Sequence, residues 1–332
     1  MTIKELAQMA GVSPSLVSFV LNGKQKEFRI SDEVAERVRR VAKETGYYPN
    51  GLAKGLREGM SRIIGVIVTE ISNPFFSDVV NNITREVERA GYAAIFASCN
   101  ESASRLCELT QKFLEKNVDG LIVTPCQDSE QDIAVLVNGG TPLVLIDRYC
   151  SGVNVSSVCL DNAGAARLLT NKLLERGYKR IVMVSHDLEV SCIKERINGF
   201  QQGISNSAEA EGSTLIMPFY DLESECDSVV AELDKNKCEA FLFASNTVAT
   251  HFLKSLRACR PDIYQTAAFA SIDGAEPFIF MDRPVIYITQ PIKEISREAV
   301  QILLSRIRNS EETRNTVELQ LPGSFAHNDN WQ

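Results

Sequence analysis

The sequence predicts an α/β protein with a small all-α head and a larger, two-lobed body of parallel sheets flanked by helices. Three short amphipathic helix patterns within the first 48 residues predict the head. Apolar runs alternate with helix-length segments from Arg62 onward and predict the body, because such runs are typical of parallel strands covered on both faces. At 332 residues, the chain also exceeds what one hydrophobic core usually organises.

The first helix of the head is expected to begin after Thr2. Thr2 and Glu5 have the spacing of a capping box, in which each side chain accepts a hydrogen bond from an otherwise unpaired backbone N–H group. Four apolar residues then follow at the spacing of one helix face: Ile3, Leu6, Ala7 and Ala10. Gly11 is expected to make the turn to the next helix.

A second and a third helix complete the head. Ser13 is expected to cap the second helix and Pro14 to open it, at a position where the missing N–H of proline costs nothing. Asn22-Gly23 ends this helix, and the third runs from Ser31 to Gly46. The residues expected to point inward are Val17, Val20 and Leu21 in the second helix and Val34, Val38 and Val41 in the third. Two short helices about a tight glycine turn, completed by a third, form a helix-turn-helix.

The second helix carries the residues that would read DNA. Its outward side chains near the N-terminus, which would meet base edges in a major groove, are Pro14, Ser15, Ser18 and Phe19. Phe19 either contacts a thymine methyl group or sugar, or belongs to the core of the head. We favour the contact, because Val17 and Val20 already point inward. The following loop adds cations beside the groove, and further cations decorate the third helix, where some are only solvated charges.

Four segments resemble the lactose-repressor (LacI/GalR) family of bacterial transcriptional regulators. They are Thr2-Ile-Lys-Glu-Leu-Ala7, Ala10-Gly-Val-Ser-Pro-Ser-Leu-Val-Ser18, Val20-Leu-Asn22 and Gly46-Tyr-Tyr-Pro-Asn50. The segment from Asn22 to Asp32 is similar to the fructose-repressor branch, the catabolite repressor/activator, whose recognition helix carries an aromatic residue where most relatives have Arg. Phe19 fits that branch. The resemblance therefore does not imply the arginine-to-guanine contact that is common at this position.

The segment Asn50–Arg57 is expected to be a hinge. Gly51, Gly55 and Gly59 each cost a helix about 1 kcal/mol relative to Ala, so the segment should be coil on its own. The resemblance implies that it folds only on DNA, pairs across a dimer and wedges Leu56 into a minor-groove step. A plain interdomain linker is the alternative. The full set of residues expected to contact DNA is Thr2, Ser13, Pro14, Ser15, Ser18, Phe19, Asn22, Lys24, Lys26, Arg29, Tyr47, Asn50, Ala53, Lys54 and Leu56.

The distribution of charge divides the chain in the same way. Ten Lys and Arg stand against seven Asp and Glu through Met60, so this part has a net charge of +3 and the remainder −11. An acidic body would repel phosphates, which confines DNA contact to the head. No apolar run reaches the length of a membrane span, and the chain starts with a polar capping box, so we expect no signal peptide, no membrane contact and a cytoplasmic location.

The sequence offers no signature of catalysis or metal binding. Its nine Cys include no C-x-x-C pair, so Cys99, Cys126 and Cys159 are interpreted as small buried apolar residues. Ser185-His186-Asp187 are consecutive and cannot turn three side chains onto one reaction centre. G-x-S-x-G, P-loop and G-x-G-x-x-G motifs do not occur. We therefore expect no enzyme, no cofactor and no metal.

The body should contain two parallel sheets side by side, with a cleft beyond the carboxyl ends of their strands. The segment 291–308 would be a helix that returns to the first lobe, and 203–213 is the most loop-like interior tract. We expect a head over 1–48, a hinge over 49–60, and a body over 61–332 whose first lobe spans about 61–160 and 291–318 and whose second spans about 161–290 and 319–332. The expected strands are Ile63–Val68, Tyr92–Ala97, Gly120–Thr124, Pro142–Ile146, Ile181–Ser185, Leu215–Pro218, Ala240–Ala244, Ala267–Ile272 and Val285–Thr289.

Polar and aromatic side chains follow several of these strands. Carboxylate, amide and guanidinium groups around an aromatic face are how proteins hold a polyol. The resemblance implies the same positions, which the family shares with periplasmic sugar-binding proteins. Singly, Asp147-Arg148 could be a strand-end salt bridge, Asn246 a helix cap, and Phe75 or Phe76 part of the core. The expected effector-binding residues are Asn73, Phe75, Phe76, Asp147, Arg148, Lys194, Arg196, Asn246, Asp273 and Gln290.

The sequence as a whole predicts a DNA-binding repressor with a periplasmic-binding-protein-like body. It would be a homodimer or tetramer that reads a pseudo-palindromic operator under the control of a sugar-type effector. Three cations, Arg148, Lys194 and Arg196, favour a sugar phosphate such as fructose 1-phosphate. An unphosphorylated mono- or disaccharide is the alternative if Asp147 neutralises Arg148 and Lys194 faces solvent. A solute-binding protein lacks support without an export signal, and a sugar-modifying enzyme without acid/base or phosphate-loop motifs.

Overall fold

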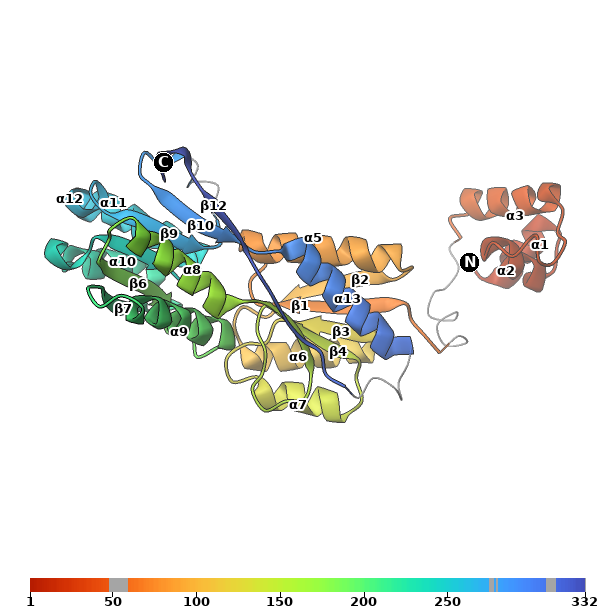
Figure 1. Cartoon of the computed structure of the whole chain (residues 1–332). Coiled ribbons are helices and arrows are strands. Elements are labelled where there is room, and N and C mark those ends of the chain that lie inside the picture. The colour runs from red at the N-terminus through yellow and green to blue at the C-terminus, as the bar shows by residue number, and fades with distance from the viewer. Residues whose placement is uncertain (48–58, 275–277, 279, 309–314, 332) are drawn as a thin grey trace. The chain divides into compact units, whose positions relative to one another are not determined.

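The computed structural model describes residues 1–47, 59–274, 278, 280–308 and 315–331 (Figure 1). The chain forms two compact units, Met1–Ser61 and Arg62–Gln332. The first unit is all-α, and the second contains two parallel-dominated sheets with helices on both faces. The predicted fold class is confirmed.

The first unit is built from α1 (Ile3–Ala10), α2 (Pro14–Leu21) and α3 (Asp32–Glu44). The capping box of Thr2 and Glu5 is present, and Gly11 ends α1 in the left-handed conformation, at φ 66°. The hydroxyl groups of Ser13 and Ser31 cap α2 and α3. The helices bury a common core of Leu6, Ala7, Ala10, Val17, Val20, Ala35, Val38 and Ala42.

The buried face of α3 differs from the predicted one. Val34 and Val41 are only half-buried, whereas Ala35 and Ala42 are buried with Val38. The buried face of α3 is therefore turned about the helix axis, so that Ala35 and Ala42 take the places predicted for Val34 and Val41. Short helices that pack closely leave little room, which favours Ala over Val at the contact.

The first sheet of the second unit has the order β11-β5-β4-β3-β1-β2, and all its neighbours are parallel. Helices α5 and α13 cover one face, and α6 and α7 the other (Figure 1). Its strands are β1 (Ile63–Val68), β2 (Ala93–Ser98), β3 (Gly120–Val123), β4 (Leu143–Ile146), β5 (Ser156–Leu160) and β11 (Glu318–Leu321). Its helices are α5 (Pro74–Arg89), α6 (Ala103–Glu115), α7 (Glu130–Asn138) and α13 (Ile292–Arg308).

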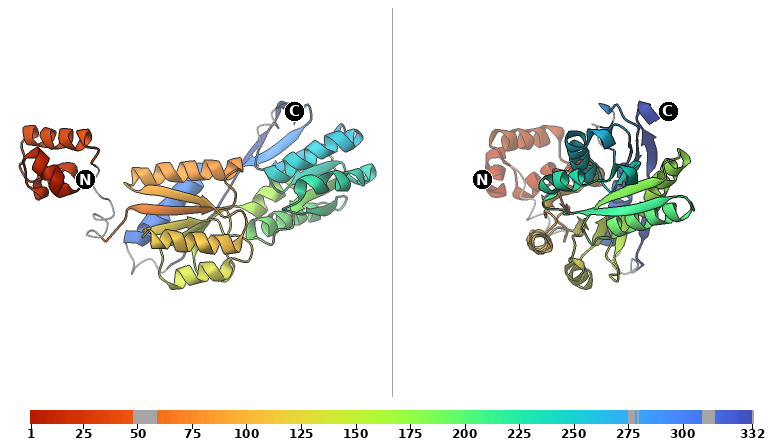
Figure 2. Two further views of the ribbon diagram at one scale, coloured as in Figure 1. Left: turned by 180° about the vertical axis from the view of Figure 1, so that it is seen from behind. Right: turned by 90° about the vertical axis from the view of Figure 1, so that its left-hand side faces the viewer.

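The second sheet has the order β12-β10-β9-β8-β6-β7 and is parallel except for the edge strand β12. Helices α8 and α9 pack on one face and α10, α11 and α12 on the other (Figure 2). The strands are β6 (Arg180–His186), β7 (Glu211–Met217), β8 (Ala240–Phe243), β9 (Ala268–Ile272), β10 (Val285–Thr289) and β12 (Ser324–His327). The helices are α8 (Asn162–Glu175), α9 (Ser191–Ser205), α10 (Leu222–Ala231), α11 (Asn246–Cys259), α12 (Pro261–Tyr264) and the short 3-10 helices η1 (Lys235–Lys237) and η3 (Asp329–Trp331).

All nine predicted strands are present, but three further strands were missed: β5, β11 and β12. Two other expectations need correction. Only 206–210 links α9 to β7, so the predicted loop 203–213 is too long at both ends. The predicted lobe boundary at 318/319 falls inside β11, which pairs with β5. The final connection to the second sheet therefore comes after Leu321.

Three connections join the sheets, after β5, after β10 and after β11. The carboxyl ends of β1, β2 and β4 in the first sheet and of β6, β8, β9 and β10 in the second deliver side chains to one shared cavity. This is the place where parallel sheets bind ligands, because the loops that follow the strands are free to carry polar groups.

Candidate functional site

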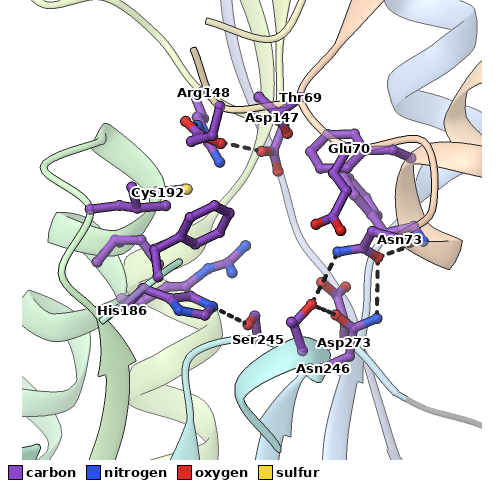
Figure 3. A pocket seen from close by; sticks show the side chains of 18 of the residues that line it. Thr69, Glu70, Asn73, Asp147, Arg148, His186, Cys192, Ser245, Asn246 and Asp273 are labelled. Atoms are coloured by element: carbon purple, nitrogen blue, oxygen red, sulfur yellow. Dashed lines mark hydrogen bonds and ion pairs between the residues drawn. The ribbon is translucent and has the colours of Figure 1, made fainter. Parts of the chain in front are cut away.

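A cavity lies between the two lobes, and the space in and around it that atoms do not fill, part of it open to solvent, is about 540 Å³ (Figure 3). Nine of the ten predicted effector residues line it: Asn73, Phe75, Phe76, Asp147, Arg148, Arg196, Asn246, Asp273 and Gln290. Lys194 does not. It lies exposed on α9 and pairs with Glu189, 2.9 Å away. Residues two apart on a helix face different directions, so Lys194 and Arg196 cannot both point into the cavity.

Asn73 links the two lobes from the start of α5. Its Oδ1 caps the helix by accepting a 3.0 Å hydrogen bond from the backbone N–H of Phe75. Its Nδ2 donates to Thr247 Oγ1 at 3.3 Å, and Asn246 Nδ2 approaches Asn73 Oδ1 at 3.5 Å. The cap of α11 is Ser245 rather than Asn246, which removes the helix-cap alternative for Asn246. Figure 3 shows these amides facing one another.

Arg148 lies in a buried group of charges in the first lobe. Its Nη1 donates to Glu101 Oε1 at 2.5 Å and to the carbonyl of Pro125 at 3.1 Å. Its Nε lies 3.4 Å from Asp147 Oδ2. Burial raises the pKa of Asp147 above its usual value, while the positive charge of Arg148 opposes this shift. Asp147 and Arg148 therefore form a salt bridge at the end of β4 and also line the cavity.

Arg196 is buried on the second-lobe side of the cavity. Its Nε donates to Asn162 Oδ1 and its Nη1 to the carbonyl of Ala244, each at 2.7 Å. Asn162 is itself oriented by a bond from its Nδ2 to the carbonyl of Leu160. These contacts fix the plane of the guanidinium group, so it can present a directed donor to a ligand.

Asp273 and Gln290 follow β9 and β10 and contact each other. Gln290 Nε2 donates to Asp273 Oδ2 at 3.1 Å. Burial raises the pKa of Asp273 to about 6. Asp147 and Asp273 both have a left-handed backbone, at φ 67° and 70°, which is uncommon for residues other than glycine. Strained backbone at a strand end often marks a functional position.

His186 is a cavity residue that the sequence analysis did not assign. Its Nε2 lies 3.2 Å from Ser245 Oγ, and its ring meets Phe219 edge-on, with centroids 5.2 Å apart. Burial lowers the pKa of His186 to about 4, so the imidazole is neutral at pH 7. Within the described chain, its buried Nδ1 has no hydrogen-bond partner.

The other lining residues that sequence reasoning missed are Thr69, Glu70, Glu101, Leu188, Cys192, Ile193, Phe219, Ser245 and Thr247. Glu70, Glu101, His186 and Ser245 each come shortly after or at the end of a strand. The strand-end rule that found Asp147 and Asp273 could therefore have found them. Glu70 and Glu101 matter most, because they add negative charge to the cavity.

The residues predicted to contact DNA lie at different depths in the head. Ser15, Lys26 and Arg29 are exposed, and Phe19 is half-buried outside the core cluster of the head as far as the structure describes it. The ring of Phe19 stacks on Phe28, with centroids 3.6 Å apart. The head-core alternative for Phe19 is therefore not supported.

Other predicted DNA contacts already have partners in the head. Asn22 Nδ2 donates to the carbonyl of Ser18 at 2.7 Å, and Lys24 pairs with Glu27 at 4.0 Å. Tyr47 packs against the core of the head. Thr2 and Ser13 act as helix caps, and Pro14 is exposed at the start of α2. Asn50, Ala53, Lys54 and Leu56 lie outside the described residues.

The described part of the chain contains no helix long and apolar enough to cross a membrane, and no group of three or more His, Cys, Asp or Glu side chains placed to hold a metal ion. Cys99, Cys126 and Cys159 are buried, as predicted. The sulfur atoms of Cys99 and Cys126 lie 3.1 Å apart.

Residues 2–50 match the family described as bacterial regulatory proteins, lacI family. Residues 61–325 match the periplasmic binding proteins and sugar binding domain of LacI family. The ribose operon repressor of Haemophilus influenzae is 28% identical over 321 residues, which cover 96% of both chains.

Two solved structures share the fold. The Cra transcriptional dual regulator of Pseudomonas putida, in complex with fructose 1-phosphate, has a TM-score of 0.72 at 20% identity and covers 80% of this chain and 98% of its own. The lac repressor dimer bound to operator and an anti-inducer has a TM-score of 0.82 at 18% identity and covers 100% of this chain and 99% of its own.

Proposed function

Because the chain belongs to the LacI family of bacterial regulatory proteins, we propose that it is a DNA-binding transcriptional repressor of carbohydrate-metabolism genes, controlled by a sugar-type effector. The observation that carries the proposal is the interlobe cavity, whose polar groups come from both lobes. A ligand that bonds to both sides favours the closed arrangement of the lobes over an open one. The name of the ribose operon repressor supports the carbohydrate assignment.

We divide the chain into a DNA-binding head over 1–48, a hinge over 49–60 and an effector-binding, dimerising body over 61–332. The exposed hydroxyl of Ser15 and the exposed cations of Lys26 and Arg29 support DNA contact by the head. The head and the hinge through Met60 together carry a net charge of +3. In a homodimer, two heads would read the halves of a pseudo-palindromic operator in the cytoplasm. The head also argues against a solute-binding protein or a sugar-modifying enzyme.

The proposed mechanism couples two sites. Closure of the cavity on an effector would change the spacing of the hinges in a dimer, and so the free energy of ordering residues 49–60 on DNA. The effector-binding groups of this proposal are the nine predicted residues of the cavity together with Glu101, His186 and Thr247.

Gel shifts of the full chain with genomic fragments test the proposal. We expect sequence-selective binding that falls steeply with salt and that a sugar from a panel of pentoses, hexoses and disaccharides changes. Deletion of residues 1–60 should abolish DNA binding while the truncated body keeps its ability to bind the sugar. DNA binding that survives the deletion contradicts the proposal.

A further inference from the structure

The described residues that line the cavity carry more acids than bases. Their carboxyl groups belong to Glu70, Glu101, Asp147 and Asp273, and their guanidinium groups to Arg148 and Arg196. His186 is neutral at pH 7 because burial lowers its pKa to about 4. Even with both Asp side chains protonated, the two Glu balance the two Arg. At pH 7 the net charge of the lining is therefore between −2 and 0.

The first cation, Arg148, is already neutralised. Glu101 Oε1 accepts a hydrogen bond of 2.5 Å from Arg148 Nη1, and Asp147 Oδ2 lies 3.4 Å from Arg148 Nε. The side chains of Glu101 and Arg148 are 2% and 8% exposed, so water screens this pair little. A phosphate dianion beside Arg148 would meet two acidic groups at short range, and the repulsion would offset the attraction of the guanidinium group.

The second cation, Arg196, directs two of its three nitrogens at protein acceptors, the Oδ1 of Asn162 and the carbonyl of Ala244. The third expected cation, Lys194, pairs with Glu189 outside the cavity. Recognition of a phosphate generally needs several convergent cations or backbone N–H groups. A ring of carboxylates, amides and one fixed guanidinium instead matches the alternating donors and acceptors of vicinal hydroxyls.

We infer that Glu101 is a specificity-determining residue, which makes the cavity select an uncharged polyhydroxylated ligand and reject the phosphate ester of the same sugar. The inference rests on the proposed function and narrows its effector class. Glu101 acts by holding Arg148 in a buried ion pair, which cancels the one guanidinium group on the first-lobe side of the described cavity lining. Without the carboxylate, Arg148 would offer its charge to an anion.

The test compares the full-length wild type with Glu101→Gln. Glutamine keeps the volume and the acceptor oxygen for Arg148 Nη1, and the contacts of Arg148 with Asp147 and Pro125 stay in place. Glu209→Gln is the matched control, because it removes one negative charge from an exposed pair with Lys179 that lies outside the cavity. Calorimetric titrations use ribose, fructose and glucose, each against its own phosphate ester: ribose 5-phosphate, fructose 1-phosphate and glucose 6-phosphate.

For the sugar that binds, we expect the wild type to bind the parent at least about tenfold more tightly than the ester. Glu101→Gln should tighten binding of the ester by about tenfold or more, which corresponds to about 1.4 kcal/mol, with a smaller change for the parent. Glu209→Gln should leave both affinities unchanged. A wild type that prefers an ester overturns the inference and leaves the proposed regulator intact, as does a folded Glu101→Gln that gains no affinity for esters.

Inorganic phosphate provides a readout that does not depend on the identity of the sugar. At millimolar concentrations it should raise the unfolding temperature of Glu101→Gln but not that of the wild type or of Glu209→Gln. Stabilisation of the wild type by phosphate contradicts the inference. Failure of every sugar and ester to bind any form removes the sugar effector from the proposed function, while the phosphate comparison still decides the role of Glu101. If Glu101→Gln does not fold, a wild type that binds an ester more tightly than its parent sugar would still overturn the inference.

Discussion

Asn73 Nδ2 donates a hydrogen bond to Thr247 Oγ1 at 3.3 Å, across the cavity and 174 residues away in the sequence. Asn73 is held in place as the cap of α5, and Thr247 lies in the first turn of α11, so the bond joins two rigid helix ends. Asn246 adds a longer contact to Asn73 Oδ1. The lobes are thus linked at the cavity by uncharged groups that a closing or opening movement must form or break.

Thr247→Val removes this hydroxyl without a change in side-chain shape. A neutral hydrogen bond contributes about 0.5–1.5 kcal/mol, so effector affinity should fall about two- to tenfold, and operator affinity without effector should change by no more than the same factor. Calorimetry with the sugar that binds, together with gel shifts, measures both. Thr250→Val on the same helix is the control, because Thr250 Oγ1 bonds only to the carbonyl of Asn246 among the described groups. Equal losses in the two variants would exclude a role for the interlobe bond.

Leu56→Ala tests the hinge that the sequence predicts. Loss of the side chain that would wedge into a minor-groove step should weaken operator binding by about 1–3 kcal/mol at fixed salt. Sugar binding and the unfolding temperature should not change. A titration of operator DNA that gives the wild-type affinity would leave residues 49–60 as a plain linker.

Phe19 substitutions test base readout by α2. Phe19→Arg should shift preference toward guanine at one symmetric operator position, because a guanidinium group donates two hydrogen bonds to guanine and a phenyl ring donates none. Phe19→Ala should mainly weaken binding, since it also removes the stack on Phe28. Selection of bound sites from a random DNA pool measures the preference. Because Phe19 lies outside the core cluster of the head, circular dichroism should show a folded head in both variants. An unfolded head would show that Phe19 belongs to the hydrophobic core of the head.

The strands that the sequence predicts are those made mainly of apolar residues. β1, β6 and β10 consist largely of Val, Ile and other apolar residues, so they can be recognised without knowledge of the tertiary structure. The missed strands lack this signal. β5 begins with two Ser, and β11 alternates Glu, Leu, Gln and Leu at a sheet edge. They are strands because β4 and β5 offer them a partner, which a local pattern cannot reveal.

The cavity was predictable as far as strand ends could locate it. Asp147 and Asp273 follow apolar strands directly, so topology alone places them at the cleft. Lys194 was assigned by charge without regard to helical direction, and its side chain points to solvent. The strand-end rule could have placed Glu101 at the cleft, but its role depends on Arg148, which is 47 residues away in the sequence. Which charges pair with one another depends on the fold, so the sign of the net charge in the cavity could not be obtained from the sequence.

Asp273→Asn tests the electrostatics of the cavity through pH. Burial raises the pKa of Asp273 to about 6 in the folded protein, above the value near 4 of an unfolded Asp. The folded state therefore binds the extra proton between these values, and this group's contribution to stability is full below about pH 4 and is lost as pH rises through about 6. Asn mimics the protonated form and still accepts from Gln290 Nε2 through Oδ1. The variant should be more stable than the wild type at pH 7.5, and the difference should disappear at pH 4.

Denaturant unfolding of both proteins at several pH values between 4 and 7.5 measures the difference. A stability gap that is constant with pH would mean that Asp273 titrates normally and that its burial is relieved by water. The same variant should bind the sugar more weakly, because an amide offers one acceptor oxygen where the carboxylate offers two. Greater stability combined with weaker sugar binding would identify Asp273 as a group kept for its ligand, because replacing it would benefit the fold and harm the site.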